Sequence, residues 1–303
     1  MKTLVVDGTN ILIRSIKASE RMSEPLSVVI EDQRVITGGV YLFIQMFSRY
    51  VRETQPDRII VCWDGGRSQY RTLIYADYKA DREERDDELG PTFAMAKEFL
   101  SLNGIHHMEV QGMEADDLVA AYTRSALRDP GEVVILSGDK DFLQLVSDRV
   151  IQIRPGVKPA VWGVAEVKEK FDCFPEDIPM LMALTGDQGD GVPGIPGFGN
   201  KTAVKYLDKY GWSWIEIMRA AEAGEDEKLA GRQDDMERNM ALVNLQVVID
   251  ENLEGGFIPL FEDHPEMTSE ITRWLGGYGF LTLLNRFQSG VLWKEPVQES
   301  LPL

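Results

Sequence analysis

The clearest pattern along the chain is a set of three short apolar runs, each of which leads to an aspartate. The runs cover residues 3–6, 58–63 and 133–136, and they lead to Asp7, Asp64 and Asp139. Helical patterns of apolar residues lie between them, over about residues 39–54, 91–104 and 114–128. β-Branched runs that alternate with helices predict an α/β fold with a mostly parallel central sheet. In such sheets ligands bind beyond the carboxyl ends of the strands, where these aspartates lie.

Two stretches interrupt this alternation. Residues 65–90 carry many charges and show no clear strand, so we expect a helical insertion or a loop there. Residues 186–199 contain six glycines, and helical patterns follow from Lys201 onward. The sequence therefore predicts an α/β unit over residues 1–180, which carries the insertion, and a helical unit over residues 181–303.

Carboxylates are the strongest chemical signal. Nine of them stand in short motifs or at predicted strand ends: Asp7, Asp64, Glu114, Asp116, Asp117, Asp139, Asp141, Asp187 and Asp190. Each pair alone is explained by helix capping or a glycine–aspartate turn. Brought together at one edge of a sheet, the nine would repel one another strongly without counter-ions. Oxygen ligands suit Mg²⁺ or Mn²⁺, and the histidines and cysteines have no zinc spacing.

Two further segments point to phosphate. The motif YKADR supplies Lys79 and Arg82, and cations aimed at a transferring phosphoryl group stabilise its charge. Arg67 and Arg71 stand just upstream. In GVPGIPGFGNKTAVKYL, glycines free the backbone and a helix starts near Lys201. Amides at a helix N-terminus bind phosphate without reading base sequence, although a tight helical turn without a ligand is the simpler alternative.

The net charge of −18 argues at first against nucleic acid, because phosphate binding normally needs a basic surface. If nine of the 50 acidic residues hold metal, 41 remain against 32 basic residues, which leaves −9. The chain has no apolar run of membrane-spanning length and no signal-peptide pattern. Its two cysteines form no disulfide framework. We therefore expect a cytoplasmic protein without a membrane partner, and a monomer by default.

Several motifs together resemble one family. VVDGTNILIR, DYKADR, GMEADD, SGDKD, GDQGDGVPGIPGFGNK and ERNMALVNL are similar to the 5′ nucleases, which include flap endonucleases and the 5′-nuclease domain of bacterial DNA polymerase I. The stand-alone bacteriophage enzymes look closest, which implies the bacterial host cytoplasm. The resemblance extends from Thr3 to about Asn285. It implies a helical arch over residues 65–90 and a helix–three-turn–helix in a C-terminal DNA-binding unit.

The resemblance also implies roles for single residues. Asp7, Asp64, Glu114, Asp116 and Asp139 match an inner metal shell, Asp141, Asp187 and Asp190 match an outer set, and Asp117 stands between them. Lys79 and Arg82 match the basic pair under the arch, and Arg14 and Tyr78 fall where the scissile phosphate or its base would be. The implied DNA contacts are Arg67, Arg71, Gly194, Ile195, Gly197, Gly199, Lys201, Thr202 and Lys205. Two or three Mg²⁺ ions, replaceable by Mn²⁺, and K⁺ at the helix–three-turn–helix complete the expected site.

The sequence thus predicts a structure-specific 5′ nuclease that hydrolyses DNA at 5′ ends and flaps and leaves a 5′-phosphate and a 3′-hydroxyl. The expected partners are 5′ flaps, 5′ ends and duplexes with a single-stranded 5′ arm, with RNA–DNA hybrids as a further candidate. Three alternatives remain at this point: a PIN-type ribonuclease, a small-phosphate phosphatase and a non-catalytic DNA-binding protein. The phosphatase is disfavoured because Thr9 stands where a second acid would be needed.

Overall fold

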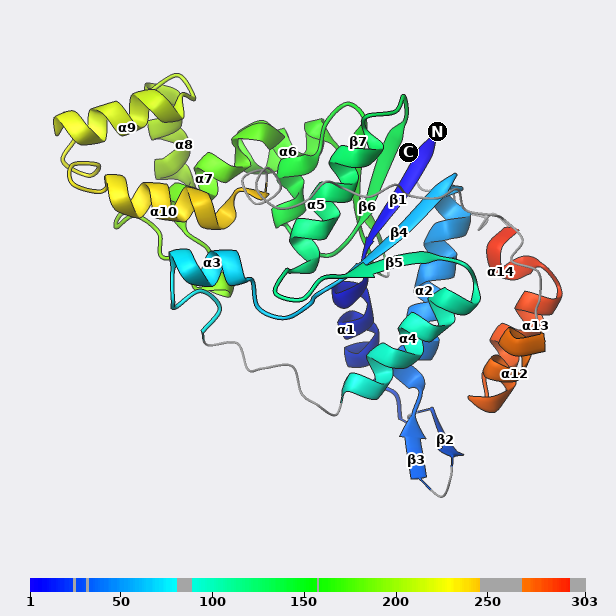
Figure 1. Ribbon diagram of the computed structural model, residues 1–303. Coiled ribbons are helices and arrows are strands. Elements are labelled where there is room, and N and C mark those ends of the chain that lie inside the picture. The colour runs from blue at the N-terminus through cyan, green and yellow to red at the C-terminus, as the bar shows by residue number, and fades with distance from the viewer. Residues whose placement is uncertain (24–25, 31–32, 81–88, 157, 246–268, 295–303) are drawn as a thin grey trace.

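The computed structural model describes every residue except 24–25, 31–32, 81–88, 157, 246–268 and 295–303. A six-stranded sheet with the order β5-β4-β1-β6-β7-β8 lies at its centre (Figure 1). The strands are β1 (Lys2–Asp7), β4 (Arg58–Trp63), β5 (His106–Glu109), β6 (Glu132–Leu136), β7 (Val150–Arg154) and β8 (Ala160–Trp162). Neighbouring strands from β5 to β7 pair in parallel, and β8 pairs antiparallel with β7. The predicted mostly parallel sheet is confirmed.

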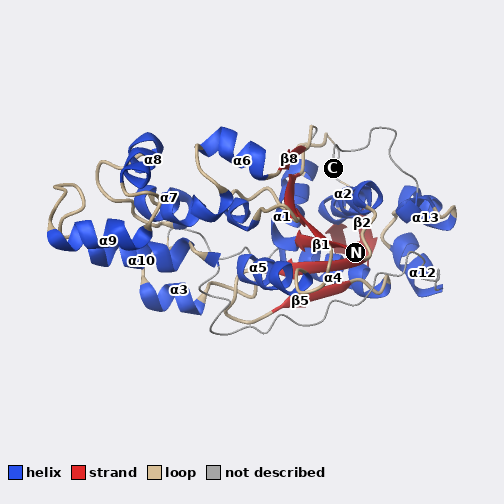
Figure 2. Cartoon of the chain, turned by 90° about the horizontal axis from the view of Figure 1, so that it is seen from above, coloured by secondary structure: helices blue, strands red, loops and turns tan. Residues whose placement is uncertain are grey.

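Helices cover both faces of this sheet (Figure 2). Alternate residues of β1 point to opposite sides, so Leu4 and Val6 pack in one apolar cluster and Val5 in another. The first cluster joins α1 (Gly8–Ser19), α2 (Gly38–Thr54) and α4 (Gly90–Leu102), and the second joins α5 (Ala115–Ala126). The predicted helices over residues 39–54, 91–104 and 114–128 therefore form close to the expected positions.

Two smaller elements leave the central layers. A hairpin of β2 (Ser27–Ile30) and β3 (Gln33–Ile36) projects between α1 and α2 (Figure 1). The charged insertion contains α3 (Gln69–Ile74), which agrees with a helical insertion. Residues 81–88 of that insertion, including the predicted phosphate ligand Arg82, lie outside the described residues.

A second group of helices extends to one side of the sheet (Figure 1). It comprises α6 (Val164–Phe171), α7 (Ile178–Thr185), α8 (Asn200–Lys209), α9 (Trp214–Ala223) and α10 (Gln233–Val243). Leu184 of α7, Leu207 of α8 and Ile217 of α9 are each fully buried in the apolar cluster that holds these helices together. The predicted helical unit is therefore present, with a core of its own.

The last described helices return to the α/β core. They are α12 (Ser269–Gly277), α13 (Leu281–Gln288) and α14 (Val291–Lys294). The rings of Trp274 and Phe99 lie 5.9 Å apart, and those of Trp293 and Phe47 lie 6.1 Å apart. The predicted division near residue 180 groups these helices with the C-terminal unit, but their apolar faces pack on α2 and α4. Within the described residues, no helix has the length and apolar character needed to cross a lipid bilayer.

Candidate active site

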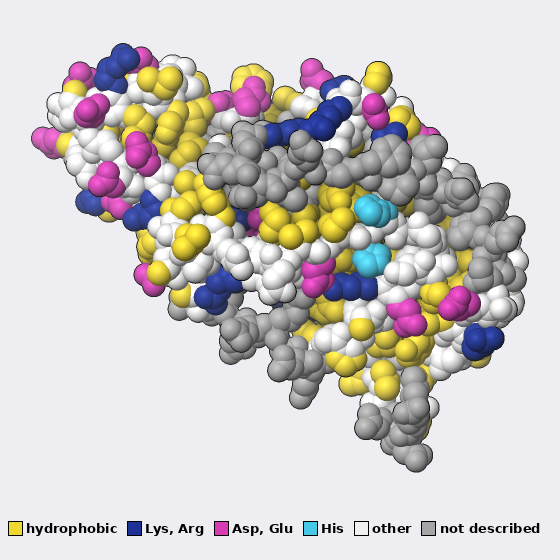
Figure 3. All heavy atoms as spheres, viewed as in Figure 1, with side chains coloured by type: hydrophobic (Ala, Val, Ile, Leu, Met, Phe, Trp, Pro, Cys, Tyr) yellow, Lys and Arg dark blue, Asp and Glu magenta, His cyan; other side chains and the backbone are white. Residues whose placement is uncertain are grey.

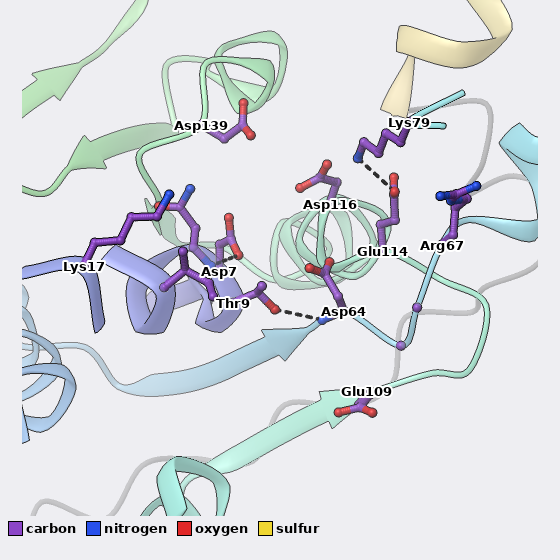
Figure 4. Close-up of a pocket in the computed structure, with 14 residues that line it drawn as sticks. Asp7, Thr9, Lys17, Asp64, Arg67, Lys79, Glu109, Glu114, Asp116 and Asp139 are labelled. Atoms are coloured by element: carbon purple, nitrogen blue, oxygen red, sulfur yellow. Dashed lines mark hydrogen bonds and ion pairs between the residues drawn. The ribbon is translucent and has the colours of Figure 1, made fainter. Parts of the chain in front are cut away.

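A cleft of about 920 Å³ opens at the carboxyl ends of β1, β4 and β6. Its walls hold five of the nine predicted metal ligands: Asp7, Asp64, Glu114, Asp116 and Asp139. Figure 4 shows that their side chains come from different strands and from the start of α5. The parallel sheet therefore brings distant carboxylates to one place, as the strand-end pattern predicts. A smaller adjoining pocket holds the other predicted acids Asp141, Asp187 and Asp190, and Asp139 lines both.

Asp7 and Asp64 are fixed by the ends of their strands. Asp7 caps α1, because its Oδ1 accepts the N–H of Asn10 at 3.0 Å, and its Oδ2 accepts the hydroxyl of Ser137 at 2.8 Å. The N–H of Asp64 donates to Thr9 Oγ1 at 3.0 Å, and Asp64 Oδ1 accepts the N–H of Ala115 at 2.7 Å. Sequence reasoning missed these polar neighbours, although each stands within three residues of a predicted ligand.

The loop after β6 is tied to α1. Gly138 donates its N–H to Asn10 Oδ1 at 3.0 Å. Asp139 donates its N–H to Ser137 Oγ, and its Oδ1 accepts the N–H of Asp141, each at 3.0 Å. Lys17 of α1 also lines the cleft, and it follows Asn10 by seven residues, which is two helical turns. Helical periodicity could therefore have identified Lys17 from the sequence.

The carboxylates destabilise one another's charged forms. Desolvation, followed by the charge of Asp64, raises the pKa of Asp7 to about 7. Desolvation raises the pKa of Asp116 far above its usual range, which Lys79 partly opposes and Asp139 reinforces. The pKa of Asp141 rises for the same reason, because it is desolvated and faces other carboxylates. Such a cluster favours a bound cation or a bound proton over free negative charge.

Lys79 supplies one positive charge within this cluster. Its Nζ lies 2.8 Å from Glu114 Oε1 and 3.4 Å from Asp190 Oδ2, and its backbone has φ of +52°. Its N–H donates to the carbonyl of Asp190 at 2.9 Å, which fastens the insertion to the loop after α7. Burial alone would lower the pKa of Lys79, but the carboxylates of Glu114 and Asp116 outweigh this effect and raise it. Lys79 therefore remains a protonated side chain of the cleft.

Three predicted roles are corrected by the geometry. The guanidinium of Arg71 holds both oxygens of Asp117, with Nη2 to Oδ1 at 2.8 Å and Nη1 to Oδ2 at 3.0 Å. These side chains are 2% and 1% exposed, so Arg71 cannot reach DNA and Asp117 is no metal ligand. Tyr78 is 2% exposed and donates its hydroxyl to Glu114 Oε2 at 2.9 Å, so it does not contact a scissile phosphate or base. The polar atoms that were predicted to bind DNA or metal instead form hydrogen bonds and ion pairs within the protein.

Arg14 and Arg67 are exposed. Arg67 lines the cleft, and the guanidinium of Arg14 lies so close to Gly138 that a Cβ there would stand 2.6 Å from Arg14 Nη2. Both positions suit the predicted contacts with phosphate. In the smaller pocket, Lys140 Nζ lies 3.0 Å from Asp187 Oδ2. Among the described residues, no three acidic, histidine or cysteine side chains are already arranged around one point as metal ligands.

The glycine-rich turn before α8 is built by close backbone contact. A Cβ at Gly194 would stand 2.2 Å from the carbonyl oxygen of Thr185, and Gly197 has φ of +82°. Ile195 is 2% exposed and packs below the turn, so its side chain is not available to DNA, contrary to the prediction. The remaining predicted contacts are at the surface or partly exposed: Gly197, Gly199, Lys201, Thr202 and Lys205. Lys201 and Lys205 are one helical turn apart on the same face of α8.

The histidines of β5 lie apart from this chemistry. His106 and His107 are partly exposed, and histidine side chains are visible at the surface in Figure 3. His107 Nε2 lies 2.9 Å from Ser101 Oγ, and neither His106 nor His107 lines the cleft. The acidic groups at the strand ends, together with Lys79, therefore dominate the polar chemistry of the site.

Comparisons with known proteins show to which family the chain belongs. The family "5′-3′ exonuclease, N-terminal resolvase-like domain" matches residues 2–172, and "5′-3′ exonuclease, C-terminal SAM fold" matches residues 173–256. A 5′-3′ exonuclease of Aquifex aeolicus is 36% identical over 251 residues, 82% of this chain and 84% of that protein. The chain therefore belongs to the 5′-3′ exonuclease family and is a nuclease.

Two further similarities concern larger or more distant proteins. DNA polymerase I of Bacillus subtilis is 32% identical over 212 residues, which are 69% of this chain and 23% of the polymerase. The chain thus spans less than a quarter of that protein. A bacteriophage T5 flap endonuclease, solved as a pseudo-enzyme–product complex with DNA and metal ions, superposes with a TM-score of 0.66. At 18% identity, over 96% of this chain and 98% of the other, it shares the fold.

Proposed function

We propose that this protein hydrolyses DNA phosphodiesters at 5′ ends and 5′ flaps with the help of divalent metal ions, and leaves a 5′-phosphate and a 3′-hydroxyl. The observation that carries the proposal is the convergence of five carboxylates on one cleft, where the pKa of Asp7 rises to about 7. The T5 flap endonuclease of the same fold was solved with DNA and metal ions. The alternative of a PIN-type ribonuclease receives no support from the similar proteins.

The donor set fits hard cations. The cleft offers carboxylate oxygens, which Mg²⁺ and Mn²⁺ prefer, and the desolvated, mutually repelling acids favour a cation over free charge. Asp7, Asp64, Glu114, Asp116 and Asp139 would hold the ions of the main cleft, and the acids of the adjoining pocket would hold a further one. Such ions lower the pKa of bound water and neutralise charge at the phosphate.

The residues of the chain would bind and orient the substrate. Lys79 is protonated and lies at the wall of the cleft, so its ammonium group can neutralise a phosphate oxygen. Arg67 and Arg14 at the exposed rim would bind neighbouring phosphates. Lys201 and Lys205, beside the free amides at the start of α8, would bind the duplex backbone without reading its sequence. Specificity would therefore come from DNA shape and the 5′ end.

The finer expectations from the sequence belong to the same proposal. In this proposal Mg²⁺ is the physiological metal ion of the cleft, and K⁺ binds at the turn before α8. RNA–DNA hybrids are further substrates, the protein acts as a monomer in the cytoplasm, and removal of primers or flaps during replication is its setting. The two-domain arrangement divides near residue 180, except that α12–α14 pack back on the α/β unit.

Asp139→Ala tests the proposal on a 5′-flap duplex with Mg²⁺. Asp139 lines both acidic pockets, so we expect turnover to fall by about 100-fold or more. Asp148→Ala removes an exposed aspartate outside the cleft and serves as the matched control, with turnover like that of the wild type. Full turnover of the wild type in EDTA, or of Asp139→Ala in Mg²⁺, would refute the metal-dependent reaction.

A further inference from the structure

Both carboxylate oxygens of Glu114 accept hydrogen bonds from buried side chains. Its Oε1 accepts from Lys79 Nζ at 2.8 Å. Its Oε2 accepts from the hydroxyl of Tyr78 at 2.9 Å and from Arg71 Nη1 at 3.2 Å. A carboxylate has about four acceptor sites, so three of them are filled by protein donors. The side chain of Glu114 thus has one preferred orientation.

Arg71, on α3, is itself held by hydrogen bonds to two other elements. Beyond the pair with Asp117, its Nε donates to the carbonyl of Leu242, near the end of α10, at 2.9 Å. A planar guanidinium with this many fixed hydrogen bonds cannot rotate without breaking several of them. Arg71 therefore joins α3, the start of α5 and the end of α10 through one buried group.

The same end of α10 is fastened to the catalytic unit a second time. Gln144 Nε2 donates to the carbonyl of Val243 at 3.1 Å, and Gln144 Oε1 accepts the N–H of Leu245 at 2.9 Å. Gln144 stands three residues after the acid Asp141. The helical unit is thereby connected directly to segments that carry carboxylates of both pockets.

Stability alone does not explain the buried pair of Arg71 and Asp117. Two charges withdrawn from water gain little net free energy compared with apolar side chains of similar size. The pair does, however, aim one guanidinium nitrogen at Glu114 Oε2. Nearby partners of this kind fix the orientation of metal-holding side chains, and their loss typically costs about 10–100-fold in metal affinity or activity.

We infer that Arg71, locked by Asp117 and by the end of α10, is a positioning residue that holds Oε2 of Glu114 so that Oε1 is presented on the side of Lys79 and the cleft. The inference rests on the proposed function, in which Glu114 helps to hold a divalent ion. It replaces the expectation that Arg71 binds DNA. Arg71 acts through Glu114 and touches neither the substrate nor the metal.

The first variant is Arg71→Gln, with Arg67→Gln as the matched control. Arg67 belongs to the same insertion but is exposed at the rim of the cleft. For Arg71→Gln we expect unchanged DNA affinity in EDTA, measured by fluorescence anisotropy of a 5′-flap duplex. The Mg²⁺ concentration for half-maximal cleavage should rise by about 10-fold or more. Arg67→Gln should show the reverse, with weaker DNA binding and an unchanged Mg²⁺ requirement.

Loss of Arg71 alone leaves Asp117 buried without its partner, which can prevent folding. The double variant Arg71→Met with Asp117→Leu removes both charges and keeps the volume apolar. We expect it to fold, to melt in EDTA at a temperature near that of the wild type, and still to need about 10-fold more Mg²⁺. The increase in melting temperature caused by Mg²⁺ without DNA, which reports metal binding directly, should shrink in parallel.

The outcomes separate this inference from the proposed function. A wild-type protein without Mg²⁺-dependent cleavage would contradict the proposed function itself. A wild type that cleaves, together with a double variant whose Mg²⁺ requirement and Mg²⁺-induced stabilisation are unchanged, would overturn only the positioning role. The positioning role would also be overturned if Arg71→Gln lost DNA affinity, as expected for Arg67→Gln, and kept the Mg²⁺ requirement of the wild type.

Discussion

The buried carboxyl of Asp7 allows a direct test of whether the cleft is destabilised by its own negative charge. Asp7 is 4% exposed, and desolvation with repulsion from Asp64 and Asp139 raises its pKa from 3.8 to about 7. Without metal, the unfolded carboxyl ionises near pH 3.8, whereas the folded one keeps its proton until about pH 7. The folded state then binds more protons in this range, so the free energy of unfolding should fall as the pH rises through it.

The size of the effect follows from the same pKa. A difference of one pKa unit corresponds to about 1.4 kcal/mol, so the rise at Asp7 corresponds to about 4 kcal/mol if it titrated alone. Neighbouring carboxylates share the titration, so we expect roughly 2 kcal/mol in practice. Asp7→Asn removes the charge while its carbonyl oxygen can still accept the N–H of Asn10.

Urea unfolding in EDTA, repeated between about pH 4 and pH 8, measures this difference. Near pH 8 we expect the free energy of unfolding of Asp7→Asn to exceed that of the wild type by roughly 2 kcal/mol. This difference in stability should disappear toward pH 4. Mg²⁺ should stabilise the wild type more than the variant. Asp148→Asn, which changes an exposed aspartate, should show no such gap. A gap that is independent of pH, or a wild type that is more stable at pH 8, would refute the reasoning.

Three further predictions concern single contacts. Lys79→Ala should lower flap cleavage by about 100-fold with little loss of DNA affinity in anisotropy assays, and unchanged cleavage would exclude a role in the reaction. Gly194→Ala places a Cβ against the carbonyl of Thr185 and should cost about 1–3 kcal/mol in urea unfolding, whereas Gly199→Ala meets open space and should cost much less. Trp274→Ala should destabilise by about 3–5 kcal/mol and Trp274→Phe by less, because the ring fills the core beneath α12.

The amino-acid sequence was sufficient for the α/β architecture and for the main cleft. Parallel strands have their carboxyl ends at one edge of the sheet, so an aspartate after each apolar run already implies that Asp7, Asp64 and Asp139 lie close together. Sequence could also place Glu114 and Asp116 at the start of a helix beside them. These conclusions depend only on local sequence patterns, namely where a strand ends and where a helix begins.

Tertiary structure decided which polar groups face the cleft and which face the interior. Asp116 and Asp117 are adjacent in sequence, but successive helical positions point about 100° apart, so Asp116 lines the cleft and Asp117 meets Arg71. Arg71 and Asp117 are 46 residues apart, and nothing in the local pattern of either one indicates the partner. The burial of Tyr78 and the return of α12–α14 to the α/β core likewise depend on packing between distant segments, which a one-dimensional pattern does not encode.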